Sequence, residues 1–512
     1  MFVCRAPDFP TPLAAILADG RDALPSNTEE VAGWHKILAC TKVLICWKDA
    51  RSFTISDKFG AARLPLLQFL LTKHGDLPLV PRKFHLAWFT NFGVDEWLDP
   101  MSAAGGNPWS GAFYVDFAQS LERACFDCIM FADTLMVSDS YGNDATHTLK
   151  NAINAPRHDP MPLVAVIGSQ TRHLGIVATM STLAYPPFLL ARLACTTDHI
   201  TEGRFGWNIV TSGENAAAQN FGLDRLPEHD LRYEMAEEYM EVVNQLFASW
   251  DKDAVILDRP SATYADSHKV RPIDFVGKYY KCRGPLNTAP SPQGRPTYFQ
   301  AGGSPRGRDF AARHADTVIA TANGVKAMKQ FRDDVRARAA RFGRDPDDVK
   351  ILYQLSPVLG ETEADAHSAN ERGLSSLRHI DQRLGLVSAL TDIDFSQFDL
   401  DKPLPALTTN GESTVLAKFA QPGSNKPLRQ LLREEGKGGV DLVGTPDQVA
   451  DRMGEVMAEV GGDGFLIKHP FHHISRKYIC EVTEGLVPAL QRRGLVRTEY
   501  TRPTLREMLL EF

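Results

Sequence analysis

The segment LGIVATMSTLAYPPFLLARLACTTDHITEGRFGWNIVTS, residues 174–212, contains two short apolar runs with a helical stretch between them. The runs LGIVATM (174–180) and GWNIV (206–210) have the length and the β-branched or aromatic content of buried strands. Between them, PPFLLARLACTTDHI (186–200) has the periodicity of a helix. Two buried strands joined by a helix predict a parallel βαβ unit.

The same alternation of apolar run and helical segment continues along the chain from about residue 83. Counting the two runs above, eight apolar runs have the character of strands. Eight buried strands separated by helices predict an α/β fold, a (β/α)8 TIM barrel, with an open doubly wound sheet as the alternative. The other six runs are FHLAWFT (84–90), DCIMFA (127–132), TYFQAG (297–302), TVIAT (317–321), VKILYQLSPVL (349–359) and GFLIK (464–468).

The predicted strands are unevenly spaced, and this spacing suggests how the chain is organised. Long connections follow the fourth and seventh strands, so we expect large insertions at about residues 211–296 and 360–440. Long connections of this kind usually shape pockets. Residues 1–82 do not follow the alternation, and we interpret them as an N-terminal extension of unknown role. One barrel domain at 83–495 and a C-terminal tail at 496–512 complete the expected organisation.

Composition narrows the class of protein. The 512 residues include 56 Lys and Arg and 63 Asp and Glu, a formal net charge of −7, without long blocks of one sign. Nucleic acid is therefore not an expected partner. No stretch approaches the ~18 consecutive apolar residues of a membrane helix, and the start of the chain lacks the apolar region of a signal peptide. We expect a cytoplasmic protein without a membrane span, in which the C-x-x-C pair Cys125 and Cys128 packs in a core.

Polar residues follow four of the predicted strands at their carboxyl ends, where the working residues of a (β/α)8 barrel lie. Each alone is weak evidence, because an Asp after a strand often caps a helix and a Gly pair often forms a turn. Together they predict a pocket for a flat heteroaromatic ligand with an attached anion. The residues are Asp133, Thr179 with Ser181, Asn208, and the 302–304 segment with Ser304.

The 174–212 segment resembles the bacterial-luciferase-like flavin monooxygenases. Within that family it is similar to the branch of the nitrilotriacetate, EDTA, long-chain alkane and dibenzothiophene-sulfone monooxygenases. Further similar blocks follow in the family's order, and the resemblance covers roughly residues 83–495. They are NFG (220–222), HDLRYEMAEEY (229–239) and GKYYKCRGPLNTAPSPQGRPTYFQAGGSPRGRDFAARHAD (277–316).

The resemblance implies an FMN site. Carried over by position, the residues that contact FMN are Asp133, Thr179, His229, Tyr233 and Ser304, with Asn208 as a further candidate. The spacing of His229 and Tyr233 agrees with this, because residues four apart lie on one face of a helix. The start of a helix also favours an anion such as a phosphate.

The resemblance further implies a two-component system. A separate NAD(P)H:flavin reductase supplies FMNH2, and this chain uses dioxygen, through a flavin hydroperoxide, to oxygenate a small organic substrate. The chain has no G-x-G-x-x-G after a strand, so we expect no Rossmann unit to bind NAD(P)H. Assembly into a homo-oligomer is implied by the resemblance alone.

The substrate side departs from the relatives. Many of them have a His-His pair soon after the first strand, whereas residues 89–111 contain no histidine. The HPFHH cluster follows the last strand, and His469 at the strand end is our candidate catalytic residue for proton transfer. Three alternatives remain open: a metal-dependent barrel hydrolase that uses these histidines with Asp133, a flavin-binding protein without oxygenase activity, and a deazaflavin-dependent reductase.

Overall fold

The computed structural model describes residues 44–49, 52–56, 82–93, 111–419, 425–436, 439–472 and 474–512. The chain divides into two compact units, Met1–Leu79 and Val80–Phe512. In the first unit, β1 (Leu44–Asp49) and β2 (Ser52–Ser56) form an antiparallel pair. The second unit contains all the other described elements.

Eight parallel strands of the second unit close into a barrel, which confirms the predicted fold class and excludes the open sheet. All eight predicted runs form barrel strands, in chain order around the barrel. The run at 349–359 is interrupted: β13 ends at Leu355, Pro357 follows, and β14 (Val358–Leu359) pairs instead with β15 (Val443–Gly444). The barrel strands are β3 (His85–Asn91), β4 (Cys128–Ala132), β5 (Gly175–Ser181), β6 (Phe205–Val210), β11 (Thr297–Gln300), β12 (Thr317–Ala320), β13 (Lys350–Leu355) and β16 (Gly464–Lys468).

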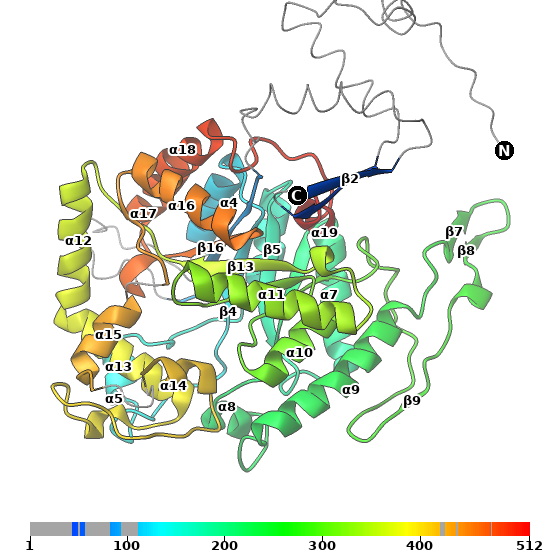
Figure 1. The fold of residues 1–512 in the computed structure, drawn as a ribbon. Helices are drawn as coiled ribbons and strands as arrows, with labels where there is room; N and C mark the ends of the chain where they lie inside the picture. Colours follow the sequence, from blue (N-terminus) through cyan, green and yellow to red (C-terminus); the bar gives the residue numbers. More distant parts are fainter. Residues whose placement is uncertain are drawn as a thin grey trace, which may run out of the picture. The chain divides into compact units, whose positions relative to one another are not determined.

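Helices surround the strands on the outside of the barrel (Figure 1). Their starts follow ordinary capping chemistry: α16 begins after Thr445, whose side chain forms a capping box with Gln448. In the part of the chain that the structure describes, no helix combines the length and the hydropathy needed to cross a membrane. The surrounding helices are α4 (Ala112–Arg123), α6 (Pro160–Gln170), α7 (Pro187–Ile200), α9 (His229–Phe247), α10 (Pro305–His314), α11 (Val325–Arg341), α16 (Pro446–Val460), α17 (Arg476–Cys480) and α18 (Val487–Arg492).

Strand side chains alternate between the barrel interior and the layer under the helices. On β16, Leu466 belongs to the interior cluster, whereas Phe465 and Ile467 pack under the helices. On β3, Ala87 is interior and Trp88 is exterior. Both faces are apolar, which explains why the strands read as continuous apolar runs. The interior cluster also contains Cys128, Met130, Val177, Phe299, Ile319 and Leu352.

The two long connections contain additional elements. Between β6 and β11 the chain forms α8 (Asn215–Asn220), α9 and two short ribbons, β7 (Val255–Asp258) with β8 (Thr263–Ala265) and β9 (Phe275–Val276) with β10 (Lys281–Cys282). Between β13 and β16 it forms α12 (Glu363–Ser375), α13 (Leu377–Thr391), α14 (Ser413–Phe419) and α15 (Leu428–Gly436).

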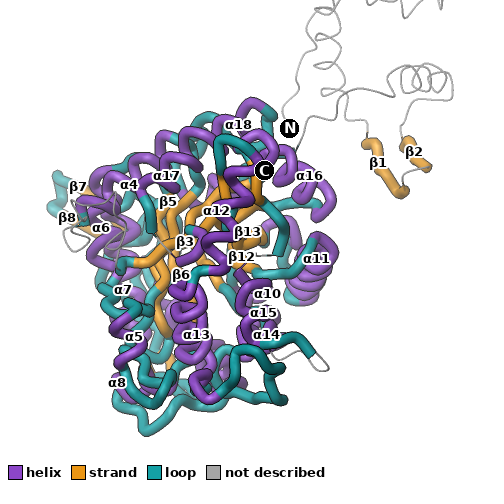
Figure 2. Tube along the Cα trace, turned by 90° about the vertical axis from the view of Figure 1, so that its left-hand side faces the viewer, coloured by secondary structure: helices purple, strands orange, loops and turns teal. Residues whose placement is uncertain are grey.

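The helices of the second long connection pack around an apolar cluster of their own, which includes Leu384, Leu416 and Leu432. Figure 2 shows α13 and α14 at one end of the barrel, together with α5 (Thr146–Lys150) and α8, and the C-terminus at the opposite end. The long connection therefore builds a cap over one end of the barrel.

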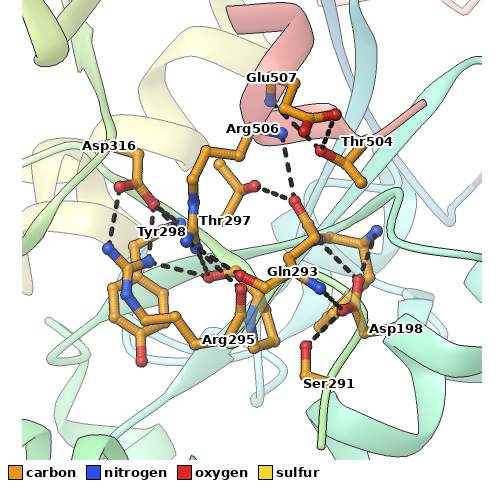
Figure 3. A network of polar contacts seen from close by, with 12 residues as sticks. Asp198, Ser291, Gln293, Arg295, Thr297, Tyr298, Asp316, Thr504, Arg506 and Glu507 are labelled. Carbon is orange, nitrogen blue, oxygen red and sulfur yellow. Dashed lines mark hydrogen bonds and ion pairs between the residues drawn. The ribbon is translucent and has the colours of Figure 1, made fainter. Parts of the chain in front are cut away.

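The last residues of the chain close the amino end of the barrel. Leu505, Met508 and Leu509 of α19 (Leu505–Leu509) belong to the interior cluster. Gly206 leaves room for Leu505, because a Cβ there would lie 3.2 Å from Leu505 Cδ2. Arg506 donates hydrogen bonds to the carbonyl oxygens of Arg295 (2.8 Å) and Pro296 (3.0 Å), within the network of Figure 3. The opposite end, where the strands have their carboxyl ends, is called the barrel mouth below.

Candidate active site

A cavity of about 230 Å³ opens at the barrel mouth, over the carboxyl ends of β4, β5, β6 and β11. Its walls also include the start of α9 and of α10 and part of the long connection between β13 and β16. Five of the six predicted cofactor-binding residues line it: Asp133, Thr179, His229, Tyr233 and Ser304. The structure therefore brings together side chains from four parts of the sequence that the resemblance had grouped.

His229, Tyr233 and Ser304 form one polar corner of the cavity. His229 is the first residue of α9, and its Nε2 lies 3.3 Å from Ser304 Oγ. Ser304 is the N-cap of α10, where its Oγ accepts a hydrogen bond from the Gly307 N–H at 3.0 Å. Burial raises the pKa of Tyr233, so its hydroxyl remains protonated and can donate a hydrogen bond. Helix starts with such donors suit an anion.

Glycines allow close approach of the backbone at this corner. A Cβ at Gly307 would lie 2.7 Å from the Tyr233 hydroxyl, and one at Gly303 would lie 2.8 Å from the Thr414 side chain. Thr414 belongs to α14, so the long connection between β13 and β16 forms this wall together with Gly411, Glu412 and Ser413. The expectation that this connection shapes a pocket agrees with its place in the cavity wall.

Thr179 and Asn208 form a hydrogen-bonded pair at the floor. Asn208 Nδ2 donates to Thr179 Oγ1 at 2.9 Å, and Thr179 Oγ1 donates to the carbonyl oxygen of Phe131 at 2.8 Å. Asn208 is buried and does not line the cavity, unlike Thr179. The Asn208 Oδ1 has no hydrogen-bond partner among the described residues. The geometry gives Asn208 the role of orienting Thr179 rather than a place in the wall.

Two carboxyl groups, of Asp133 and Glu214, also line the cavity. Burial is the largest influence on Asp133 and raises its pKa to about 6, although its Oδ1 accepts a hydrogen bond from Thr134 N at 2.8 Å. Burial likewise raises the pKa of Glu214. The Arg157 guanidinium attracts both carboxylates and so acts to lower both pKa values, and it donates to Thr134 Oγ1 at 2.8 Å. Titratable groups perturbed in this way are typical of functional sites.

His469 lies outside this cavity. It is buried on the exterior side of the barrel wall, where its ring contacts Trp88, Phe117 and Tyr478 at centroid distances of 5.1, 6.0 and 5.3 Å. It is not one of the residues that line the cavity. A catalytic role for His469 therefore stays a prediction. The described geometry does not bring His469 to the cavity that Asp133 and Thr179 line.

Sequence reasoning missed several residues of the cavity. Glu214 follows β6 by four residues, and its position after a strand end was a signal that could have identified it. Arg232 lies on the same helix as His229 and Tyr233, and Gln300 ends β11. The 411–414 segment gave no signal, because it follows no strand and has no periodicity.

The described residues do not form a metal site. Within the described ranges, no group of three or more His, Cys, Asp or Glu side chains is arranged to hold a metal ion. His473 and the His472 side chain lie outside the described residues, so the full HPFHH cluster cannot be placed. Asp133 lines the cavity, whereas His469 packs against Trp88 outside it.

Comparison with known proteins identifies the family. The family model described as luciferase-like monooxygenase matches residues 84–464. The chain is 35% identical to the dimethyl-sulfide monooxygenase of Hyphomicrobium sulfonivorans, covering 84% of this chain and 90% of that protein. It is 37% identical to the dibenzothiophene-sulfone monooxygenase of Rhodococcus erythropolis strain XP, covering 84% and 96%.

A solved structure extends the comparison to three dimensions. The crystal structure of a riboflavin lyase with modified FMN and its substrate riboflavin superposes with a TM-score of 0.76 at 30% identity, covering 84% of this chain and 96% of that one. The resemblance found in the sequence is thereby confirmed in both sequence and fold. The chain belongs to the luciferase-like monooxygenase family.

Proposed function

We propose that this protein is the oxygenase of a two-component system: it binds FMNH2 supplied by a separate NAD(P)H:flavin reductase in the cytoplasm and uses dioxygen to oxygenate a small organic substrate. The observation that carries the proposal is the cavity at the barrel mouth, lined by Asp133, Thr179, His229, Tyr233 and Ser304. Family relatives that oxygenate dimethyl sulfide or dibenzothiophene sulfone support the reaction class.

The donors of the cavity fit FMN. The corner made by His229, Tyr233, Ser304 and the start of α10 offers hydroxyl, imidazole and backbone donors to a phosphate. Gly302 and Gly303 line the cavity, and the lack of a Cβ lets Gly302 pack against Gly307 and Gly303 against Thr414. Asp133 and Thr179 present further polar groups to the cavity. These residues would hold the phosphate at one end of the cofactor and orient its ring system at the other.

The protein's contribution to the reaction is mainly positional. Reduced FMN, held by these residues, would supply the electrons for the reaction with dioxygen. The chain must orient the cofactor and restrict the access of water, since water promotes unproductive loss of hydrogen peroxide. The wall contributed by the 411–414 segment partly encloses the cavity. Assembly into a homo-oligomer stays part of the proposal.

Anaerobic titration with FMNH2, followed by rapid mixing with oxygen, tests the proposed function. We expect saturable binding of FMNH2 and then a transient absorbance that differs from that of reduced and of oxidised FMN. Saturable binding without the transient would indicate a flavin-binding protein without oxygenase activity. Stoichiometric metal in the purified protein without affinity for flavin would favour the hydrolase alternative.

The phosphate corner predicts the effect of a double variant. His229→Ala combined with Tyr233→Phe removes two donors, so we expect FMNH2 affinity to fall by about 1–3 kcal/mol. Binding is measured by anaerobic fluorescence titration. The matched control, His268→Ala combined with Tyr264→Phe, changes the same residue types near the β7–β8 ribbon and should leave the affinity unchanged. An unchanged affinity in the first variant would remove both residues from the site.

A further inference from the structure

The cavity occupies only part of the barrel mouth. It lies over β4, β5, β6 and β11, whereas β16 and β3 lie side by side on another part of the barrel. A substrate must reach the cofactor from within the same mouth. The residues at the carboxyl ends of β16 and β3 are therefore candidates for the substrate side of the site.

Lys468 ends β16 and points into the barrel mouth. Leu466 faces the barrel interior and Ile467 faces the helices, so the two-residue period of the strand turns Lys468 inward. Its strand partner is Phe89, which also packs against the interior cluster. The residue is partly exposed, although protein surrounds most of its ammonium group.

Within the described ranges, no side chain compensates the charge of Lys468. No hydrogen bond or ion pair joins it to any residue in the described part of the chain. Burial, and secondarily the positive charge of Arg383, lower its pKa to about 8. No carboxylate of the described residues acts in the opposite direction. Charges in such surroundings are normally paired, and the described residues give this ammonium no anion.

Arg383 belongs to α13, one helical turn beyond His379, and its positive charge acts on Lys468. Toward β16, Phe471 packs against Gly373 of α12, where a Cβ would lie 2.4 Å from its ring, and against His379 at a centroid distance of 5.9 Å. On the same helix, the carbonyl oxygen of Asp381 lies 2.8 Å from His147 Nε2 of α5. Arg383 is itself buried, with 6% of its surface exposed.

We propose that Lys468 and Arg383 form an anion-binding site at the barrel mouth, which receives an oxyanion group, a carboxylate or a sulfonate, of the organic substrate. This inference rests on the proposed function, because the bound oxyanion belongs to a substrate only if the protein is an oxygenase. Binding of the oxyanion itself does not require the cofactor. An ammonium and a guanidinium from two different elements suit one oxyanion, because both groups make charge-assisted hydrogen bonds to its oxygens. Substrates with such a group are thereby favoured over neutral ones of the same size.

Protection of Lys468 from acetylation tests the site directly. The full-length protein is treated with acetic anhydride at pH 8, and the acetylation of each lysine is quantified by mass spectrometry. We expect propionate or ethanesulfonate to slow the acetylation of Lys468 several-fold, and propionamide to have no effect, at constant ionic strength. Lys477, an exposed lysine of α17, is the internal reference and should react equally under all conditions.

Two variants test whether Arg383 is the partner of Lys468 and distinguish the anion-binding site from the proposed flavin site. Arg383→Met should raise the propionate concentration needed for half-maximal protection about tenfold, and Arg372→Met on α12 is the matched control. Lys468→Met should bind FMNH2 as the unmodified protein does. Loss of FMNH2 affinity in Lys468→Met would assign Lys468 to the flavin and overturn this inference while leaving the proposed function intact.

Three further outcomes would also overturn the inference. The first is equal acetylation of Lys468 with and without organic anions, and the second is equal protection by propionamide. The third is protection by inorganic phosphate or FMN alone, which would show that the site takes phosphate rather than an organic oxyanion. A failed FMNH2 titration of the unmodified protein would overturn the proposed function without affecting the acetylation result.

Discussion

Asp127→Asn is expected to lower the free energy of unfolding by about 3–5 kcal/mol, because it breaks a buried ion-pair network. Asp127 precedes β4 at the amino end of the barrel, and its Oδ1 accepts from Arg497 at 2.6 Å and lies 3.0 Å from His85 Nδ1. Its Oδ2 accepts from Leu86 N at 2.8 Å. Asparagine would leave the Arg497 guanidinium with only part of its compensation, from Glu511.

The direction of the pKa shift gives the pH dependence of this loss. Burial acts to raise the pKa of Asp127, but His85, Arg497 and the Leu86 N–H together lower it below the usual value of 3.8. A lowered pKa means that the stabilisation is present above about pH 4 and is lost as the pH falls through the lower value in the folded state. The difference between Asp127→Asn and the unmodified protein should therefore shrink in acid.

Urea unfolding followed by circular dichroism measures the effect. The matched control is Asp447→Asn, which removes a carboxylate from an exposed ion pair with Arg493 and should leave the unfolding midpoint nearly unchanged. An Asp127→Asn midpoint equal to that of the control would show that Arg497 and His85 find other partners.

The barrel strands could be predicted from the sequence because each one is buried on both faces. A run such as GFLIK stands out as apolar between polar segments, and the structure places β16 at the predicted residues 464–468. The same property hides the direction of each side chain. Where both faces are apolar, the sequence does not show which alternate residues face the interior. This is why His469 was assigned to the pocket, whereas the structure turns Lys468 inward and packs His469 against Trp88.

The cavity could be predicted where its residues follow strands or match family blocks, as Asp133 and Ser304 do. The wall formed by residues 411–414 could not, because it reaches the cavity through tertiary packing. Helices α13, α14 and α15 pack on one another through their own apolar cluster, and that packing brings Thr414 to Gly303 across more than a hundred residues of sequence. Short-range patterns contain no information on a contact of this kind.

Asp133→Asn is expected to raise the free energy of unfolding by up to about 3 kcal/mol above pH 6, the opposite of the result expected at Asp127. The two aspartates flank the same strand, β4, one at each end of the barrel. Burial raises the pKa of Asp133 to about 6 from 3.8, and this difference of about two pK units corresponds to about 3 kcal/mol. Because the folded state holds the proton more tightly, stability falls as the pH rises from about 4 to 6.

Urea unfolding at pH 4 and pH 7.5 tests this expectation. Asp133→Asn should match the unmodified protein at pH 4 and exceed it at pH 7.5, since asparagine retains an oxygen that can accept from Thr134 N. Asp139→Asn, an exposed change in the same connection, should show no gain at either pH. A loss of stability at pH 7.5 would mean that attraction to Arg157 outweighs the cost of burial.

The stabilised variant is also expected to bind FMNH2 less tightly. A carboxyl group that lowers stability at neutral pH has no structural reason to line a cavity, whereas Asp127 at the other end of β4 is fully paired. Groups that cost stability are commonly found where function requires them. If Asp133→Asn gained stability and kept its full affinity for FMNH2, the buried carboxyl group would have to serve a step after cofactor binding. Asp133 rather than His469 would then become the first candidate for proton transfer.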